Sequence, residues 1–314
     1  PEVHALMREL RRVIDEYPGK VLVGETDDIR FYGDGHDELH LSFNFALMRT
    51  NRMTPQWVRK NQDERLNALP TGSWPCNTLG NHDSARMMSE FGDGENDLAI
   101  ARVNLAMLLT LWGTPFLYNG EEIGMTNTLV DDPRWFRDPL CARAYRLETQ
   151  LLGSSHIEAV QRAARDGRDK TRTPMQWANR ANAGFSPDGV ETWLPVNQNY
   201  RDGVNVEDQL TSDESLLKDY QSLLEVRLKY PALVSGSFSW IRPEDKNVLA
   251  YVRETDHQAC IIVLNMSKNK QTFILPDRRG NIRQVYSTLK GTPLSNQGQL
   301  SLEPFSVVIF EANG

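Results

Sequence analysis

The chain has 314 residues, of which 39% are hydrophobic and 25% are charged, and its formal net charge is −7 at pH 7. These proportions are ordinary for a globular protein, and the length suffices for one large domain and a small one. The acidic balance gives no reason to expect a nucleic acid or an anionic membrane as a partner. No apolar run reaches the roughly 18 residues that a membrane span requires.

The three cysteines, Cys76, Cys141 and Cys260, lie far apart in the sequence. Their spacing matches neither a CxxC motif nor a zinc-binding pattern, so we expect no metal bound by cysteine. A reducing cytoplasm is the simplest location for such a chain.

The first 235 residues alternate between strand and helix patterns. Apolar residues at helical spacing predict a helix over 1–17. Short apolar runs predict strands in 20–25, 39–48, 76–83 and 114–125, and helices roughly at 54–69 and 97–112 separate them. Such alternation is typical of a parallel sheet with helical crossovers. The carboxyl ends of its strands are where an α/β fold carries functional groups.

The second part of the chain follows a different pattern. Residues 126–210 lack clean periodicity and read as a long insertion. Thr211-x-x-Glu214 fits a capping box, which predicts that a helix opens there and ends near Tyr230-Pro231. Short strand candidates then follow at 247–253, 259–265, 271–275, 282–287 and 299–311. They predict an antiparallel sheet domain, a small sandwich.

Two carboxylates, Glu25 and Asp83, each follow a predicted strand. If the strands are parallel, both side chains lie at the same rim of the sheet, and paired carboxylates suit glycoside chemistry. His82 could donate to a sugar hydroxyl, and Arg86 could hold a nearby carboxylate ionised. Judged alone, Glu25 is more often a solvated residue or a helix cap.

Two motifs also have a purely structural interpretation. Asn81-His82-Asp83 fits an Asx-turn that caps the helix after it. The charged run RDGRDKTR, residues 165–172, would ordinarily be a solvated loop.

A family resemblance rests on four segments that occur in this order: VLVGE (21–25), LGNHDSAR (79–86), GTPFLYNGEEIGM (113–125) and GRDKTRTPMQW (167–177). Together they resemble the α-amylase superfamily of retaining glycosidases, glycoside hydrolase family 13. The string that runs from TRTPMQW to WLPVNQNY (171–200) is most similar to the α-glucosidase and oligo-1,6-glucosidase branch. The resemblance covers the whole chain.

The resemblance implies a role for each matching residue. Glu25 matches the general acid/base, and Asp83 matches the transition-state stabiliser that grips hydroxyls of the sugar before the scissile bond. His82 matches the imidazole that binds the same sugar. Arg172 matches the residue that helps to close the non-reducing end, where the family pairs it with an Asp from an early barrel loop. Glu122 is taken as structural.

The family's nucleophile is an Asp in a GFRxD-like segment, and this chain contains no such segment. The implied fold class is therefore α/β: the C-terminal half of a (β/α)8 TIM barrel (strands 5–8), followed by an all-β antiparallel sandwich. We expect the half barrel in 1–235, with the insertion at about 126–210, and the sandwich in 236–314. The helix over 1–17 resembles the one after the nucleophile, so the chain reads as the C-terminal part of a longer protein.

The implied function is a retaining α-glucosidase that removes terminal α-linked glucose from oligosaccharides. Lacking the nucleophile, this chain is expected to be inactive alone and to associate with the missing N-terminal half or a second copy. No cofactor is expected for this chain, and calcium stays possible in the full-length enzyme, because the usual calcium ligands of the family would precede residue 1. Two alternatives stay open: a transglycosylase or isomerase that forms trehalulose, isomaltulose or trehalose, and a non-enzymatic interaction subunit. The sequence also leaves α-1,4 against α-1,6 preference open.

Overall fold

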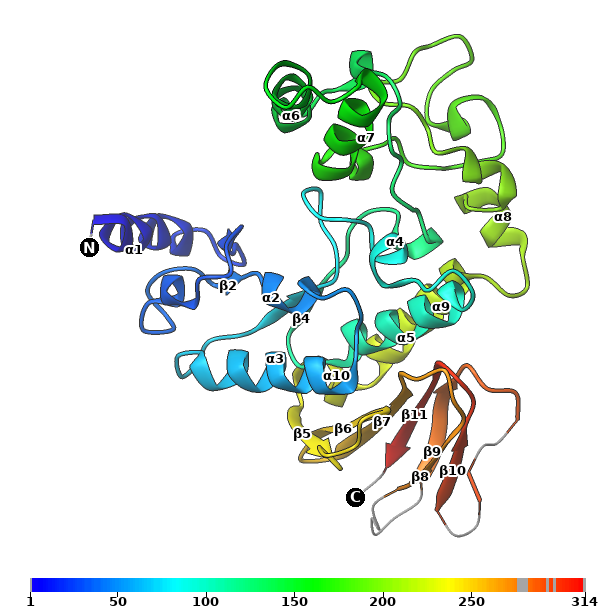
Figure 1. Cartoon of the computed structure of the whole chain (residues 1–314). Helices are drawn as coiled ribbons and strands as arrows, with labels where there is room; N and C mark the ends of the chain where they lie inside the picture. Colours follow the sequence, from blue (N-terminus) through cyan, green and yellow to red (C-terminus); the bar gives the residue numbers. More distant parts are fainter. Residues whose placement is uncertain (1, 276–281, 292–293, 296–297, 313–314) are drawn as a thin grey trace. The chain divides into compact units, whose positions relative to one another are not determined.

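The computed structural model describes residues 2–275, 282–291, 294–295 and 298–312 (Figure 1). Pro1 of the predicted first helix lies outside them. Contacts divide the chain into two compact units. Unit 1 comprises Pro1–Leu79, Arg102–Phe116 and Ser222–Gly314, and unit 2 comprises Gly80–Ala101 and Leu117–Gln221. Over the described ranges, we find no helix with both the length and the apolar character needed to cross a bilayer.

Unit 1 contains two pairs of parallel strands. β1 (Val23–Gly24) pairs with β2 (Leu41–Ser42), and β3 (Cys76–Thr78) pairs with β4 (Thr114–Phe116). Each strand lies within a predicted range, but each is shorter than its apolar run. The prediction that 39–48 is one strand is wrong in its second half, where α2 (Phe45–Met48) forms.

Asn44 explains why β2 stops where it does. Its buried amide donates to Oδ1 of Asn61 at 2.8 Å and to Oδ1 of Asn77 at 3.0 Å. Gln62 donates to the same Asn77 oxygen at 2.9 Å. Buried polar groups need such partners, so these side chains tie α2 and the next helix to β3.

The helices predicted at 1–17 and 54–69 are present in unit 1 as α1 (Glu2–Asp15) and α3 (Pro55–Ala68). The short 3-10 helix η1 (Ile29–Tyr32) and α10 (Pro231–Ser235) were not predicted. The Thr54 hydroxyl accepts from the backbone N–H of Trp57 and caps α3. The unit boundaries fall within α5 (Asp97–Thr110) and α9 (Leu216–Lys229).

The capping box predicted at Thr211 is wrong. Thr211 ends α8 (Val206–Thr211), and its hydroxyl donates to the carbonyl of Asp208 at 2.9 Å. Ser215 caps α9 instead, because its hydroxyl accepts from the backbone N–H of Lys218 at 3.3 Å. Thr211 is therefore the last residue of one helix, and Glu214 lies in the connection before the next one.

The C-terminal part of unit 1 is an antiparallel sheet domain, as the sequence predicts. Five strands pair in the order β5 (Ser237–Ile241), β6 (Val248–Thr255), β7 (Gln258–Asn265), β11 (Ser306–Ala312) and β9 (Ile282–Ser287). A second sheet pairs β8 (Gln271–Ile274) with β10 (Gln299–Leu302). Phe273 and Leu300 from the small sheet share one core with Val263 and Phe310 from the large one. Predicting 299–311 as one strand is wrong, since β10 and β11 belong to different sheets, and β5 was not predicted.

Two buried arginines join β6 and α9 to the end of α5. The guanidinium of Arg253 donates to the carbonyls of Thr110 and Leu111, both at 2.9 Å, and to that of Gly236 at 3.0 Å. Arg227 donates to the carbonyl of Leu109. Burial, together with the nearby charge of Arg227, lowers the pKa of Arg253 to about 10. These side chains satisfy carbonyls that a helix end leaves unpaired.

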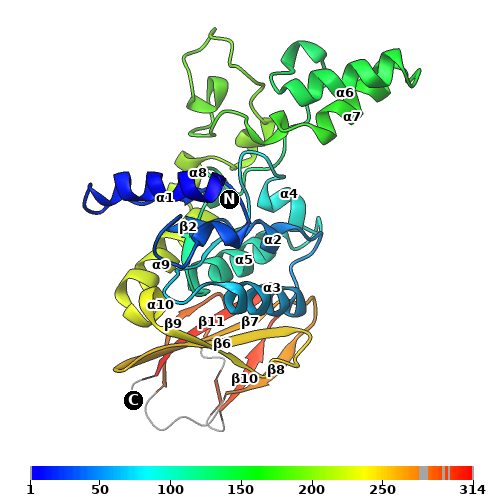
Figure 2. The ribbon, with the colours of Figure 1, turned by 90° about the vertical axis from the view of Figure 1, so that its left-hand side faces the viewer.

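Unit 2 is built from short helices and long connections (Figure 2). It contains α4 (Met87–Phe91), η2 (Glu121–Ile123), η3 (Pro133–Trp135), α6 (Pro139–Gln150), α7 (His156–Asp166), η4 (Asp169–Thr171), η5 (Ala181–Gly184), η6 (Gln198–Asp202) and α8. α6 and α7 lie side by side in both views. Both helices fall inside the stretch 126–210, whose pattern indicated no regular structure. A capping box of Ser155 and Glu158 opens α7.

We predict that Arg253→Met lowers the free energy of unfolding of the chain by about 3–5 kcal/mol. The substitution leaves several buried carbonyls without a donor. Urea denaturation of the chain, followed by far-ultraviolet circular dichroism, measures the loss. Arg52→Met is the control, because Arg52 is exposed and its replacement should change stability by about 0.5 kcal/mol or less. Equal midpoints for the two variants would contradict the assignment.

Candidate active site

The loop after β3 carries Asn81, His82 and Asp83 and begins unit 2. The backbone N–H of Asp83 donates to Oδ1 of Asn81 at 2.9 Å, so the predicted Asx-turn is present. It does not cap the following helix, because α4 begins only at Met87, after Arg86. Other side chains of unit 2 reach the Asp83 carboxylate.

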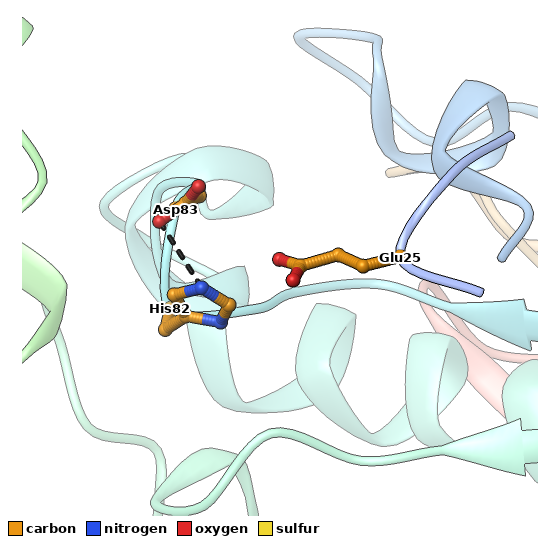
Figure 3. Close-up of side chains that lie close together, drawn as sticks. All are labelled: Glu25, His82 and Asp83. Carbon is orange, nitrogen blue, oxygen red and sulfur yellow. Dashed lines mark ion pairs between the residues drawn. The ribbon is translucent and has the colours of Figure 1, made fainter. Parts of the chain in front are cut away.

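Asp83 is held by three basic side chains. Nε2 of His82 lies 3.3 Å from its Oδ1 (Figure 3). Arg172 donates to the same oxygen, and Nη1 of Arg168 donates to Oδ2 at 3.1 Å. Partial burial acts to raise the pKa of Asp83, but the hydrogen bonds from Arg172 and Arg168 bring that pKa below its ordinary value. The carboxylate is therefore ionised at neutral pH.

Arg172 is also tied to the backbone of the loop. Its Nε donates to the carbonyl of His82 at 2.9 Å, and the Thr171 hydroxyl donates to the same carbonyl at 3.0 Å. The indole of Trp193, 49% exposed, donates to the Arg172 carbonyl at 2.8 Å. The structure thus brings together the predicted site residues His82, Asp83 and Arg172. Trp193 was not among them, although it lies within the family-like string 171–200, as the first residue of WLPVNQNY.

Arg168 is a site residue that the sequence reasoning missed. Its guanidinium makes a two-pronged ion pair with Asp138, whose side chain is fully buried. The interpretation of 165–172 as a solvated loop is wrong for its centre, since Asp169 is 1% exposed. A charge run alone gives no sign of this, because the buried partner lies 30 residues earlier in the chain.

Arg86 does not have the role expected of it. Its buried guanidinium donates to the backbone carbonyls of Asn119 and Thr171, both at 2.9 Å. These bonds connect segments of unit 2 rather than ionise a catalytic carboxylate. Glu122 accepts from the backbone N–H of Gly120 at 2.7 Å, which agrees with a structural role. Burial raises the pKa of its neighbour Glu121 to about 8.

Glu25 belongs to unit 1, where it directly follows β1 and is exposed (Figure 3). The backbone around it is fixed. The Ser42 hydroxyl donates to the Thr26 carbonyl at 2.7 Å, and Arg65 donates to the Asp27 carbonyl at 2.8 Å. A carboxyl group at the carboxyl end of a parallel strand has the position expected of a functional group in an α/β fold.

Comparison with known proteins covers nearly the whole chain. Residues 1–236 match the family described as "Alpha amylase, catalytic domain", and residues 248–309 match the "Alpha-amylase SusG C-terminal domain". The chain is 30% identical over 294 residues to the oligo-1,6-glucosidase of Parageobacillus thermoglucosidasius, covering 88% of this chain and 52% of that protein. It is 27% identical over 331 residues to the trehalose-6-phosphate hydrolase of Bacillus subtilis (strain 168), covering 99% and 58%.

Solved structures give the same result. The trehalose-6-phosphate hydrolase of Bacillus licheniformis matches with a TM-score of 0.83 and 26% identity, over 100% of this chain and 60% of that one. The trehalulose synthase of Pseudomonas mesoacidophila MX-45 matches with a TM-score of 0.85 and 28% identity, over 100% and 59%. The chain spans little more than half the length of these relatives. It belongs to the alpha-amylase family and has that family's catalytic-domain fold, followed by a C-terminal sheet domain.

Proposed function

We propose that this chain supplies the acid/base part of a retaining α-glucosidase that removes terminal α-linked glucose from oligosaccharides. The observation that carries the proposal is the state of Asp83. Its pKa is held below the ordinary range, and it lies beside His82 and Arg172 in unit 2. An ionised carboxylate next to an imidazole can accept hydrogen bonds from vicinal sugar hydroxyls and stabilise positive charge that develops on the ring.

Glu25 is the proposed general acid/base. A glycosidic oxygen leaves readily only after it receives a proton, and a carboxylic acid can give that proton and later activate water. The match to the catalytic domain of the alpha-amylase family over residues 1–236 supports this assignment, as does the position of Glu25 directly after β1. His82 and Arg172 are the proposed sugar-binding residues.

We further propose that the two parallel strand pairs, β1–β2 and β3–β4, correspond to strands 5–8 of a (β/α)8 barrel. A retaining mechanism needs a second carboxyl group about 5–5.5 Å from the acid, to attack the anomeric carbon. The sequence has no GFRxD-like segment to supply it. The chain by itself is therefore proposed to be inactive, with the nucleophile supplied by the first half of the catalytic domain.

The orientation of α1 supports a missing partner. His4 and Arg8 on its polar face bind the buried carboxylate of Glu38, at 2.8 and 2.7 Å. Its apolar face is therefore turned outward, with Val3 55% and Leu6 58% exposed. An exposed apolar helix face of this kind is typical of an interface. The proposed occupant is the N-terminal half of the barrel, because the matched relatives are almost twice as long as this chain.

A second candidate function is transglycosylation or isomerisation. The similarity to a trehalulose synthase structure, at 28% identity, favours it. The two functions share the acid/base and the stabiliser, and they differ in whether water or a sugar accepts the glucosyl group. Product analysis with sucrose and with maltose distinguishes them, because hydrolysis gives only free monosaccharides.

The first prediction concerns turnover of an aryl α-glucoside. The purified chain alone should release no glucose. A pair that co-purifies after co-expression with the N-terminal half of the Parageobacillus thermoglucosidasius enzyme should release it. Glu25→Gln in that pair should reduce the rate by about 10²–10⁴-fold, because the proton donor is lost. If the chain alone releases glucose and Glu25→Gln abolishes that release, the proposal that the chain alone is inactive is refuted. If the purified pair releases no glucose, the glucosidase assignment is contradicted.

The second prediction concerns association through α1. Size-exclusion chromatography with light scattering should show the chain alone in assemblies larger than a monomer. Leu6→Glu should shift it toward monomer, since the apolar contribution of Leu6, about 1.5–3 kcal/mol when fully buried, is replaced by a charge. Ala5→Glu adds the same charge beside the apolar face and should leave the assemblies intact. A monodisperse monomer at all concentrations would overturn the partner proposal.

A further inference from the structure

We infer that Arg168 is a positioning residue that fixes the orientation and the ionisation of Asp83, and that buried Asp138 is its anchor. The inference rests on the proposed function in one respect, because Asp83 is the carboxylate that the function assigns to sugar binding. All three side chains belong to unit 2.

Both carboxylate oxygens of the anchor, Asp138, accept hydrogen bonds from side-chain and backbone donors. The Asp138 side chain is fully buried, and its Oδ2 accepts from Nε of Arg168 at 2.9 Å while its Oδ1 accepts from Nη2 at 2.9 Å. The backbone N–H groups of Arg168 and Leu140 also donate to it, each at 3.0 Å. Such a two-pronged, charge-assisted pair is both stronger and better defined in direction than a single hydrogen bond. The hydrogen bonds from Arg168 lower the pKa of Asp138 far below its ordinary value.

The backbone beneath this pair is also fixed. The buried carboxylate of Asp169 accepts from the backbone N–H of Arg137 at 2.8 Å and from that of Asp138 at 3.0 Å. Asp138 caps α6, so its carboxylate cannot move without opening the first turn of that helix. Gly167 allows the two segments to approach, because a Cβ there would overlap Sγ of the buried Cys141.

The remaining edge of the guanidinium reaches Asp83. Nε and Nη2 are occupied by Asp138, and Nη1 donates to Oδ2 of Asp83 at 3.1 Å. The guanidinium is planar and rigid, so its pairing with Asp138 determines where Nη1 points. Oδ2 of Asp83 therefore has a fixed partner. Oδ1 accepts from Arg172 and lies 3.3 Å from Nε2 of His82, and both of these side chains are partly exposed.

The charges that face Asp83 define the expected titration. Within the described part of unit 2 they include those of Arg168, Arg172 and His82, and Tyr118 is also within electrostatic reach. A cation paired with a carboxylate lowers its pKa, commonly by 1–3 units. Removing Arg168 must therefore raise the pKa of Asp83. A purely structural arginine, one that only ties α6 to η4, would leave that pKa unchanged.

The test is an NMR titration of the Asp83 carboxyl carbon in the 314-residue chain, with the resonance assigned by Asp83→Asn. Arg168→Gln should raise the Asp83 pKa by about one unit. Asp138→Asn should raise it by less, because the guanidinium keeps its charge and loses its anchor. Arg165→Gln is the matched control: it removes an exposed arginine three positions earlier, and it should change nothing. Equal Asp83 pKa values in the wild type and in folded Arg168→Gln would overturn the inference.

A conservative variant covers the case in which Arg168→Gln does not fold. Arg168→Lys keeps the charge but replaces the fork with a single ammonium, which cannot pair with both oxygens of Asp138 and still reach Asp83. It should raise the Asp83 pKa by less than one unit and lower the thermal midpoint. An unchanged pKa in both Arg168→Lys and Asp138→Asn would overturn the inference. The titration uses no substrate, so its outcome is independent of whether the chain takes part in glucoside hydrolysis.

Discussion

Unit 2 depends on the buried guanidinium of Arg86. The guanidinium donates to the carbonyls of Asn119 and Thr171. The backbone N–H of Arg86 donates to Oδ1 of Asn127 at 2.9 Å. The Arg86 guanidinium carbon also lies 5.1 Å from the ring centre of Tyr118. Burial lowers the pKa of Arg86, but an arginine keeps its proton under these conditions. The Arg86 guanidinium thus joins the loop that bears Asp83 to the segments that contain Asn119 and Thr171.

The neighbourhood of Arg86 explains two further features of the motifs. Burial raises the pKa of Glu121 to about 8, although the charge of Arg86 acts to lower that pKa. Its Oε1 lies directly beneath Gly80, where a Cβ would overlap it. The glycine before Asn81-His82-Asp83 is therefore needed for close approach. The acidic pair after β4 supports the loop, and Asp83 supplies the chemistry proposed for it.

Sequence reasoning located what is encoded locally. Short apolar runs mark β1 to β4, and the motif residues His82, Asp83 and Arg172 do lie together. It failed where secondary structure or burial depends on contacts with residues far away in the sequence. α7 buries small side chains such as Ala159 and Ala163, which give a weak apolar signal, and the burial of Asp169 depends on contacts with α6. The orientation of α1 could not be predicted either. Its sequence shows that one face of the helix is apolar, but it does not show whether that face or the polar face packs against the rest of unit 1.

The two arginines at Asp83 differ in what holds them, and that difference matters for the proposed chemistry. Arg168 pairs with the fully buried Asp138, where low polarity strengthens the attraction, so it stays in place. Arg172 is retained by Nε, which donates to the His82 carbonyl, while its ion pair with Asp83 is partly exposed and correspondingly weaker. A sugar hydroxyl that approaches Oδ1 of Asp83 therefore competes with Arg172, while Oδ2 keeps its hydrogen bond to the anchored Arg168. The carboxylate can exchange one hydrogen bond for substrate without losing its orientation, because the other oxygen remains fixed.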